Sequence, residues 1–446
     1  MKITLGIDIG TTKCAAVLLD HEKQDLLEIS SEAHKADLKT IEGHSEQDPA
    51  LLLKSVIKII NQLPSDLRNQ VAAIGVTGQM HSVMGWNENE IFPLITWQDR
   101  RCGLDGKLDE FRQKSGYDLH DGYGAATLAW LGKETDARAH AATIMDYLTM
   151  RLCGNHSPVT DASNAASWGI FDLQKNQWDS SAANALGIPE RLLPELKKTG
   201  EAVGCLCKEW SEFLGLPAGI PVINAIGDNQ ASVFGTGKDF GQELYLTLGT
   251  GAQLSTVISE AEFQTLSPKG KLEIRPFDNT RKLAVCSALC GGRAFAWIGD
   301  MVNEILKELG CREFAQGELL DRIDFLSEQT LNQGNPALKV TPSFLGERND
   351  PELKGSISGL TLTNFSLGAL GAAAAEGILE NLISEFPPEL LKKRTLVLGS
   401  GNGIRKVKTI QQMIRKKFTQ QFILTSTREE ACCGAAVLAG NKIWGF

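Results

Sequence analysis

One short pattern occurs twice in this chain, about half its length apart. Residues 6–12 (GIDIGTT) and 246–252 (LTLGTGA) each combine the end of an apolar strand with a Gly-Thr turn, and an apolar segment that can form a second strand follows each turn. Such an internal repeat indicates two related halves. A chain of 446 residues can hold two or three domains, and the repeat favours two, which we place at residues 1–235 and 236–446.

Strands and helices alternate along the whole sequence. Runs of β-branched and apolar residues predict strands at 3–9, 14–19, 71–77, 221–226, 243–248, 252–257, 283–290 and 394–398. Longer segments predict helices at 49–63, 291–308, 366–384 and from about residue 405. This alternation is typical of an α/β fold rather than an all-β fold.

Composition narrows the classes of function. Lys and Arg total 45 and Asp and Glu total 54, so the formal net charge is -9, which argues against a dedicated nucleic-acid binder. Asp8 interrupts the N-terminal apolar run too early for a signal peptide, and no apolar stretch has the roughly 18 residues of a membrane span. The ten cysteines lack paired metal-ligand spacing, so we expect reduced, mostly buried thiols in a cytoplasmic protein.

The two Gly-Thr turns can bind an anion. Glycine permits positive φ angles and close approach, so the backbone N–H groups of such a turn can surround a phosphate oxygen, and threonine hydroxyls add donors. Taken alone, each turn is more commonly a plain tight hairpin. Asp8 favours the phosphate interpretation of the first turn, because a carboxylate in an apolar strand is costly to bury without a cation, and here it can hold hydrated Mg²⁺.

A third glycine cluster, residues 399–403 (GSGNG), lies between a predicted strand and a predicted helix. No segment of the chain has the G-x-x-x-x-G-K-[ST] pattern of a P-loop, so a P-loop kinase is not expected. The first glycine turn leads into a strand instead of a helix, which argues against a Rossmann dinucleotide site.

Three polar segments follow predicted strands. Asp228, in the sequence GDNQ, is either the N-cap of the next helix or a general base at the carboxyl end of a strand, and the spacing favours neither. Residues 77–81 (TGQMH) offer an amide and an imidazole to a polyol, although His81 can also be a structural histidine. In isolation, residues 97–101 (WQDRR) predict a turn with a surface ion pair.

Taken together and in order, these segments resemble the FGGY family of carbohydrate kinases over nearly the whole chain. The similar segments are GIDIGTT (6–12), TGQMH (77–81), TWQDRR (96–101), TDASNAASWGIFDL (160–173), GDNQ (227–230), LTLGTGA (246–252), GGRAFAWIGD (291–300), GERNDPELKGSISGL (346–360) and LVLGSGNG (396–403). The resemblance implies two α/β domains with the actin-like, ribonuclease H-like fold and an interdomain cleft, the sugar mainly on the N-terminal domain and ATP–Mg²⁺ mainly on the C-terminal one.

The resemblance also implies roles for individual residues. Asp228 would be the general base, and Asp8 and Asp228 would be the carboxylates that position Mg²⁺ through water. The sugar site would comprise Gln79, Met80, His81, Asp99, Arg100 and Asp228. The ATP and phosphate site would comprise Asp8, Gly10, Thr11, Thr12, Gly249, Thr250, Gly251, Gly292, Gly401 and Asn402.

Within the family, TGQMHSVMGW (77–86), the Trp-Gln-Asp of 97–99, NAASWGIFD (164–172) and YGAATLAWL (123–131) resemble the sedoheptulokinase branch. The implied reaction is ATP-dependent phosphorylation of the terminal hydroxyl of a ketose, with sedoheptulose giving its 7-phosphate. One position departs from the pattern. Many relatives carry Lys or Arg where this chain has Ala15, and the nearest basic residue here is Lys13, which leaves open whether this loop offers a cation to phosphate.

Other interpretations stay open at this stage. Xylulose or another pentulose is an alternative acceptor. From other classes, the alternatives are an actin-like ATPase acting as a chaperone or filament, which has no use for the TGQMH and TWQDRR segments, and a non-catalytic sugar sensor. The expected partners are a ketose and ATP, with neither nucleic acid nor membrane, and the sequence does not decide whether the chain forms a homodimer.

Overall fold

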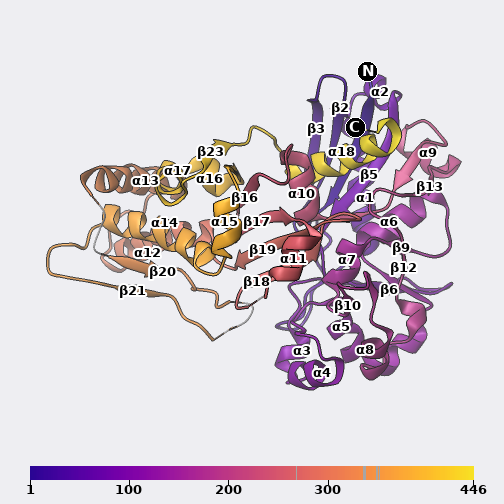
Figure 1. The fold of residues 1–446 in the computed structure, drawn as a ribbon, viewed down its shortest axis with the longest axis horizontal. Coiled ribbons are helices and arrows are strands. Elements are labelled where there is room, and N and C mark those ends of the chain that lie inside the picture. The colour runs from indigo at the N-terminus through magenta and orange to yellow at the C-terminus, as the bar shows by residue number, and fades with distance from the viewer. Residues whose placement is uncertain (268, 335–337, 348–349, 351, 446) are drawn as a thin grey trace. The chain divides into compact units, whose positions relative to one another are not determined.

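The computed structural model describes residues 1–267, 269–334, 338–347, 350 and 352–445 (Figure 1). The chain forms two compact units. The first contains residues 1–236, residues 276–280 and the chain from residue 427 onward, and the second contains residues 237–275 and 281–426. The chain therefore leaves the first unit after residue 236 and returns to it twice.

A seven-stranded sheet forms the centre of the first unit. Its order is β13 (Ala202–Cys205), β14 (Pro221–Ile223), β5 (Val71–Gly78), β1 (Ile3–Ile9), β2 (Lys13–Asp20) and β3 (Asp25–Ala33), and β15 (Ile226–Gly227) also pairs with β5. Strand β1 is antiparallel to β2 and parallel to β5. The carboxyl ends of β1, β5 and β15 therefore meet at one edge of the sheet.

Helices and short strands complete this unit. The helices are α1 (Pro49–Gln62), α2 (Ser65–Arg68), α3 (Arg101–Leu104), α4 (Leu108–Ser115), α5 (Gly124–Leu131), α6 (Ile144–Cys153), α7 (Ala162–Ser167), α8 (Ser180–Ala185), α9 (Lys208–Leu214), α10 (Asp228–Thr236) and α18 (Glu430–Trp444), with 3₁₀ turns at Gly132–Ala137 and Glu190–Leu192. The short paired strands are β4 (Glu46–Gln47) with β7 (Leu94–Ile95), β6 (Met84–Trp86) with β8 (His140–Ala142), β9 (Val159–Thr160) with β12 (Glu195–Leu196), and β10 (Phe171–Asp172) with β11 (Gln177–Trp178).

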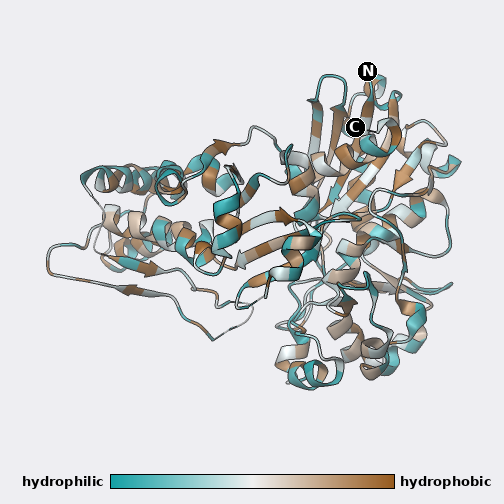
Figure 2. Cartoon of the chain, viewed as in Figure 1, coloured by the Kyte–Doolittle hydropathy of each residue, from teal (hydrophilic) through white to brown (hydrophobic). Residues whose placement is uncertain are grey.

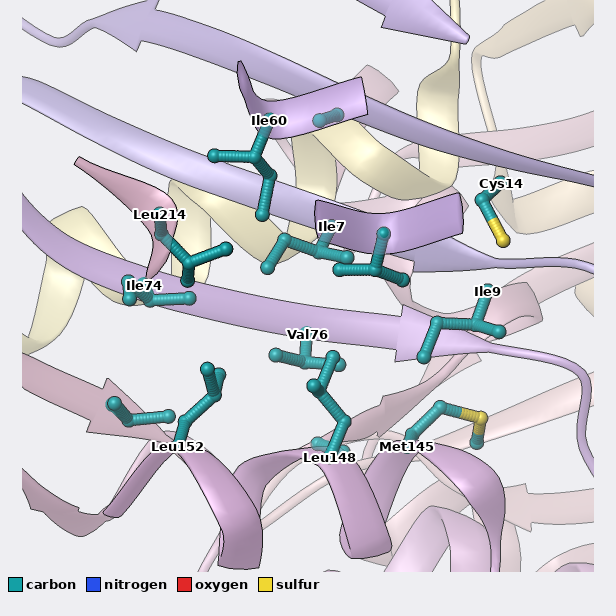
Figure 3. Packing of buried hydrophobic residues seen from close by; sticks show 14 of the residues in the cluster. Ile7, Ile9, Cys14, Ile60, Ile74, Val76, Met145, Leu148, Leu152 and Leu214 are labelled. Carbon is teal, nitrogen blue, oxygen red and sulfur yellow. The ribbon is translucent and has the colours of Figure 1, made fainter. Parts of the chain in front are cut away.

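The larger core of this unit lies between the sheet and helices α1 and α6. Helix α1 starts where the sequence predicts, because the Asp48 side chain accepts from the Ala50 and Leu51 amides and Pro49 occupies the first turn. Its apolar residues recur at helical spacing and face the sheet. Figure 3 shows this layer, in which Ile7, Ile9, Cys14, Ile74 and Val76 of the strands pack with Ile60 of α1 and with Met145, Leu148 and Leu152 of α6.

The opposite face of the same sheet is covered by α18, which packs on β1, β2 and β5 and against α10. Since side chains alternate along a strand, Ala15, Val17 and Leu19 of β2 face this helix and pack with Cys432 and Ala436. The layer is thin. A Cβ atom on Gly6 would lie 2.0 Å from the Cys432 carbonyl oxygen, so the helix backbone rests almost directly on the strand.

The second unit repeats the central arrangement of the first. Its six-stranded sheet has the order β18 (Leu272–Pro276), β19 (Lys282–Ala288), β17 (Ala252–Ile258), β16 (Glu243–Leu248), β22 (Leu396–Ser400) and β23 (Gln421–Leu424). Strand β16 is antiparallel to β17 and parallel to β22, as β1 is to β2 and β5. The pattern that occurs twice in the sequence is therefore a repeat of structure.

Helices surround the second sheet. They are α11 (Glu260–Thr265), α12 (Gly292–Glu308), α13 (Gln316–Gln333), α14 (Leu367–Ile383), α15 (Pro388–Lys393), α16 (Asn402–Lys406) and α17 (Lys408–Lys417), and β20 (Lys339–Thr341) pairs with β21 (Ser356–Ser358). Figure 2 shows α13 and α17 largely hydrophilic on their visible sides, whereas α14 is mostly apolar. Helix α14 is the buried member because its small residues let α13 and β20 approach closely.

The sequence predictions of elements hold with two differences. The strand predicted at 221–226 is divided into β14 and β15, because Asn224 turns its side chain to the Gly200 amide and the Lys198 carbonyl. The helix predicted from about residue 405 begins at Asn402 and is interrupted at Val407, after which α17 starts with its first amides bound to Asp324.

Two further expectations from the sequence concern the cysteines and membrane-spanning helices. All ten cysteines are free thiols, and six of them are buried. Among the helices in the described parts of the chain, none combines the length and the apolar character needed to cross a membrane.

Candidate active site

Three parallel strands of the first unit bring polar residues to one edge of its sheet. Asp8 lies near the end of β1, opposite Thr77 of β5. The Gln79 amide, just beyond β5, donates to the Ile9 carbonyl oxygen (3.0 Å). Asp228 follows β15, whose Gly227 is paired with Gly78, and it occupies the first turn of α10. Ligands of α/β proteins bind at such carboxyl ends.

Asp8 lies in a strongly perturbed environment. Its Oδ1 atom is buried and has no hydrogen-bond partner. Burial, followed by the nearby carboxylates of Asp228 and Glu429, raises the pKa of Asp8 to about 7, while Lys13 acts in the opposite direction. A buried carboxylate near two others is costly to ionise, so this position favours binding of either a proton or a positive ion.

These residues fit Mg²⁺ in a limited way. The unpartnered Asp8 oxygen and the neighbouring Asp228 carboxylate are the hard oxygen ligands that Mg²⁺ prefers. Across the residues that the structure describes, no group of three or more His, Cys, Asp or Glu side chains could hold a metal ion. A magnesium ion here would take few protein ligands, with water or phosphate oxygens as the others, as is usual for this ion.

His81 has a constrained conformation just beyond the end of β5. Its φ angle is 70°, in the left-handed region that only glycine adopts readily. The ring stacks on Tyr123 with centroids 4.6 Å apart, and Nδ1 contacts the Ser167 carbonyl oxygen at 2.6 Å. Since a carbonyl oxygen only accepts, Nδ1 carries the proton and Nε2 of the neutral ring is an acceptor. The ring therefore has a fixed orientation and tautomer.

The segment 160–167 holds both His81 and Asp228 in place. The Ser167 hydroxyl accepts from the His81 amide (3.0 Å), and the Ser163 hydroxyl accepts from the Gly227 amide (2.9 Å). Site predictions from the sequence did not include these two serines, although the segment resembles the family pattern. Met80 packs against Gly227, where a Cβ would lie 2.6 Å from its Sδ atom.

Gln47 is a third residue that the site predictions missed. It is buried and lies at the centre of a side-chain network. Its Nε2 atom donates to the Thr11 carbonyl and to Asp37 (both 2.8 Å), and its Oε1 atom accepts from Gln79 Nε2 (2.9 Å). Gln79 Oε1 in turn accepts from the Ser82 hydroxyl. Gln79 is 2% exposed. Because its side-chain amide is hydrogen-bonded to Gln47 and Ser82, it holds these two side chains in place.

The first Gly-Thr turn is fixed by this network and by an indole. Trp97 Nε1 donates to the Thr11 hydroxyl (2.8 Å). The Gly10 amide donates to the Lys13 carbonyl and closes the turn, and the Thr12 side chain is exposed. Trp97 and Gln47 come from the segments near the candidate sugar site, so the turn is positioned by residues from that side.

The WQDRR segment differs from its sequence expectation. Its ion pair is buried, because both oxygens of Asp99 accept from the Arg101 guanidinium and the pair is at most 4% exposed. Arg101 also binds Glu46 (2.7 Å). The side chain of Arg100 is exposed. The pair thus ties this segment to Ser45 and Glu46.

In the second unit, three glycine turns meet at the strand ends. The Gly292 amide donates to the Gly249 carbonyl (3.0 Å) and the Gly291 amide to the Thr250 carbonyl (2.8 Å), so the start of α12 adjoins the second Gly-Thr turn. Gly401 has φ 85° and approaches Leu248, and Asn402 opens α16. The predicted ATP-site residues of this unit, Gly249, Thr250, Gly251, Gly292, Gly401 and Asn402, therefore converge, and helix starts favour anions.

The GERNDPEL segment is only partly described. Arg348, Asn349 and Pro351 lie outside the described residues. Glu347 is buried and binds Lys271 (2.8 Å) and Asn381 (2.9 Å), which anchors the start of this segment to α14.

Comparisons with known proteins bear on the family and the fold of the chain. A family model for the N-terminal domain of the FGGY family of carbohydrate kinases matches residues 3–235. Sedoheptulokinase from Homo sapiens is 30% identical over 454 residues and covers 93% of this chain and 93% of its own. Xylulose kinase from Lactococcus lactis is 28% identical, covering 98% of this chain and 87% of the relative. The structure of a ligand-bound xylulose kinase from Lactobacillus acidophilus has a TM-score of 0.82 at 23% identity, over 99% of this chain and 90% of that one.

The duplicated sheets define a two-domain, actin-like fold of the kind found in sugar kinases. The chain belongs to the FGGY family of carbohydrate kinases, and it is an ATP-dependent sugar kinase. Family membership sets aside the alternative of an actin-like chaperone or filament.

Proposed function

We propose that this kinase transfers the terminal phosphoryl group of ATP to the terminal hydroxyl of a ketose, and that the ketose is sedoheptulose. The observation that carries the proposal is the placement of Asp8 and Asp228 at adjoining strand ends, where their carboxylates interact. The 30% identity to human sedoheptulokinase over 93% of the chain supports the choice of sugar.

In the proposed reaction, Asp228 accepts the proton of the attacking hydroxyl. The hydroxyl oxygen then forms a bond to the terminal phosphorus of ATP, the bond from that phosphorus to the bridging oxygen breaks, and ADP leaves. Met80 and His81 orient the sugar from the β5 side. A carboxylate at a strand end can do this work because the neighbouring serine hydroxyl of Ser163 fixes the backbone just before it.

Bound Mg²⁺ would neutralise part of the negative charge on the phosphates. Asp8, with its buried unpartnered oxygen, is the residue we assign to holding it, together with Asp228. The glycine turns of the second unit are assigned to the nucleotide, with backbone N–H groups as the donors. We further propose that the sugar lies on the first unit, that ATP lies mainly on the second, and that the enzyme works in the cytoplasm.

The experiment is ADP release with a panel of acceptors: sedoheptulose, xylulose, ribulose and glycerol. We expect the highest kcat/KM with sedoheptulose. A much higher value with xylulose would make the chain a pentulose kinase, the second candidate, which the Lactococcus lactis relative favours. A lack of sugar-dependent ADP release with any acceptor would favour the non-catalytic sensor instead.

The Asp228→Asn variant tests the general base. We expect kcat to fall by about 10²–10⁴-fold, the usual contribution of a positioned base, with the KM for ATP little changed. Asp161, a buried carboxylate of the same unit that caps α7, provides a control for structural loss, since Asp161→Asn should affect stability more than the pH dependence of kcat. Near-normal turnover by Asp228→Asn would refute the assignment.

A further inference from the structure

An ion pair joins the first Gly-Thr turn to the start of α18. Lys13 Nζ lies 2.5 Å from Glu429 Oε1, although the two residues are 416 positions apart in the chain. The Lys13 side chain is 48% exposed and the Glu429 side chain 19%. The pair thus adjoins the candidate phosphate turn while its ammonium group is still accessible from solvent.

Glu429 adopts a disfavoured backbone conformation to make this contact. Its φ and ψ angles are 51° and 55°, the left-handed region in which a side chain crowds the following carbonyl. Glu429 occupies the N-cap position of α18, yet its side chain makes no capping hydrogen bond. Strained residues of this kind tend to occur where function requires them, and here the side chain is directed to Lys13 instead of the helix.

The position of the cation has a packing explanation. Ala15 is 1% exposed and packs against Cys432 and Ala436 of α18. A lysine or arginine at position 15 would have to enter this thin apolar layer. Lys13 is on the same face of β2 as Ala15, but it is two residues nearer the turn and outside the apolar layer. A cation at position 13 can therefore reach the turn without entering that layer.

The surrounding charges make a cation necessary. Asp8 interacts with the carboxylates of Asp228 and Glu429 and with the ammonium group of Lys13. A triphosphate that approaches this group of carboxylates is repelled by them. Lys13 is the side chain that opposes this repulsion, and in the free enzyme Glu429 neutralises and holds it.

We propose that Lys13 binds the phosphoryl group that is transferred, and that Glu429 is a positioning residue that holds the Lys13 ammonium group beside the turn. The proposal rests on the proposed function, since it assigns the transfer to the surroundings of Asp8 and Asp228. It assigns to Lys13 the contact that Ala15 cannot make.

Two neutral variants of similar shape, Lys13→Met and Glu429→Gln, test the proposal, because they remove charges of opposite sign. We expect Lys13→Met to lower kcat by about 10–100-fold, the size of a lost charge-assisted hydrogen bond, and to weaken ATP binding in calorimetry without sugar. Glu429→Gln should lower kcat less, by about 3–10-fold, and should tighten ATP binding, since it removes a negative charge near the phosphates.

An ion pair that only supports the fold gives a different result. Loss of either partner then shifts the melting temperature in the same direction and leaves ATP affinity unchanged. The matched control is the pair Lys58–Glu32 on the same unit, whose variants Lys58→Met and Glu32→Gln should leave kcat and ATP affinity within about twofold. If ATP binding moves in the same direction in Lys13→Met and Glu429→Gln, or if Lys13→Met keeps its kcat, the proposal is wrong.

Glu429→Gly separates conformation from charge. Glycine relieves the left-handed strain, so we expect the melting temperature to rise by about 2–4 °C while kcat falls as in Glu429→Gln. A variant that is more stable with unchanged kcat would overturn the positioning role. Failure of this inference can be told apart from failure of the proposed function, because the acceptor panel and Asp228→Asn would still report sugar phosphorylation if only this inference failed.

Discussion

The two Gly-Thr hairpins have the same topology but are held in different ways. The first turn is held by side chains, because Trp97 and Gln47 both bind Thr11. The strand that leads into it contains the buried Asp8. In the second, the residue corresponding to Asp8 is Thr247, whose hydroxyl shares a hydrogen bond with Ser400 (2.9 Å). The turn itself is bound through its backbone carbonyls by the amides of Gly291 and Gly292.

The difference shows how a duplicated hairpin becomes specialised. The first turn has a carboxylate, a lysine and side-chain partners from the sugar side, which suits chemistry on a metal-associated phosphate and an acceptor hydroxyl. The second turn is neutral, and its backbone is closed by hydrogen bonds between glycines, including the bond from the Gly249 amide to the Gly251 carbonyl (3.0 Å). Four predictions test this contrast.

The largest expected effect concerns the acidic position. Asp8→Asn should lower kcat by about 10²–10³-fold, because an amide cannot neutralise a cation at the phosphates. Thr247→Val, the same position in the second hairpin, should cost less than about fivefold, since it removes one neutral hydroxyl pair. The measurement is ketose-dependent ADP release. Equal losses in both variants would mean that the hairpins are not specialised.

The pH dependence of stability gives the second test. The pKa of Asp8 is raised from 3.8 to about 7 in the folded state, so folding favours the protonated form, and the stability gained at low pH is lost as the pH rises from about 4 to 7. Without metal ions, we expect the wild type to lose up to about 4 kcal/mol over this range relative to Asp8→Asn. Denaturation of both proteins at pH 4–8 measures it.

The control for this titration is Thr247→Val, whose stability should follow that of the wild type at every pH. A constant difference between the wild type and Asp8→Asn would contradict the raised pKa of Asp8.

The third test uses the glycines. A Cβ on Gly401 would lie 2.3 Å from the Leu248 carbonyl oxygen, and its φ angle is 85°, so Gly401→Ala should cost about 2–4 kcal/mol of stability. On Gly10 a Cβ would lie 3.0 Å from the Lys13 carbonyl oxygen, and Gly10→Ala should cost about 1 kcal/mol or less. Chemical denaturation compares the two. The opposite order would show that the first turn, too, is held by close backbone approach.

The smallest effect concerns the side chains that hold the first turn. Gln47→Leu leaves the Thr11 carbonyl and the Gln79 amide without this partner, so we expect a loss of about 1–3 kcal/mol of stability and a severalfold drop in kcat/KM. Thr250→Ala, in the second turn, should change stability by less than about 0.5 kcal/mol because its side chain is exposed. A similar loss in both variants would remove the contrast between the turns.

Much of the fold could be predicted from the sequence, because its signals are local. The Asp48–Pro49 cap, the apolar period of α1 and both hairpins follow from neighbouring residues. The glycine turn at 399–403 was also predictable, because a run of glycines between a predicted strand and a predicted helix is visible in the sequence. The division of 221–226 was not, because it depends on Asn224 binding Gly200 in a distant loop.

The supports of the site were missed for the same physical reason. Gln47, Ser163, Ser167 and Glu429 act through partners that are 32 to 416 residues away, and nothing in their neighbouring sequence signals those partners. The Asp99–Arg101 pair is local but its burial is not, because Ser45 and Glu46 cover it from another segment.

Helix α18 has a consequence for synthesis of the protein. It covers one face of the first sheet, yet the ribosome makes it only after the whole of the second unit. Until then Ala15, Val17 and Leu19 lack their covering layer, so the nascent first unit presents an apolar surface to chaperones. The packing of β1 and β2 is therefore completed only after residues 430–444 are translated, and a messenger truncated before residue 430 should yield a chain that is bound by chaperones and degraded.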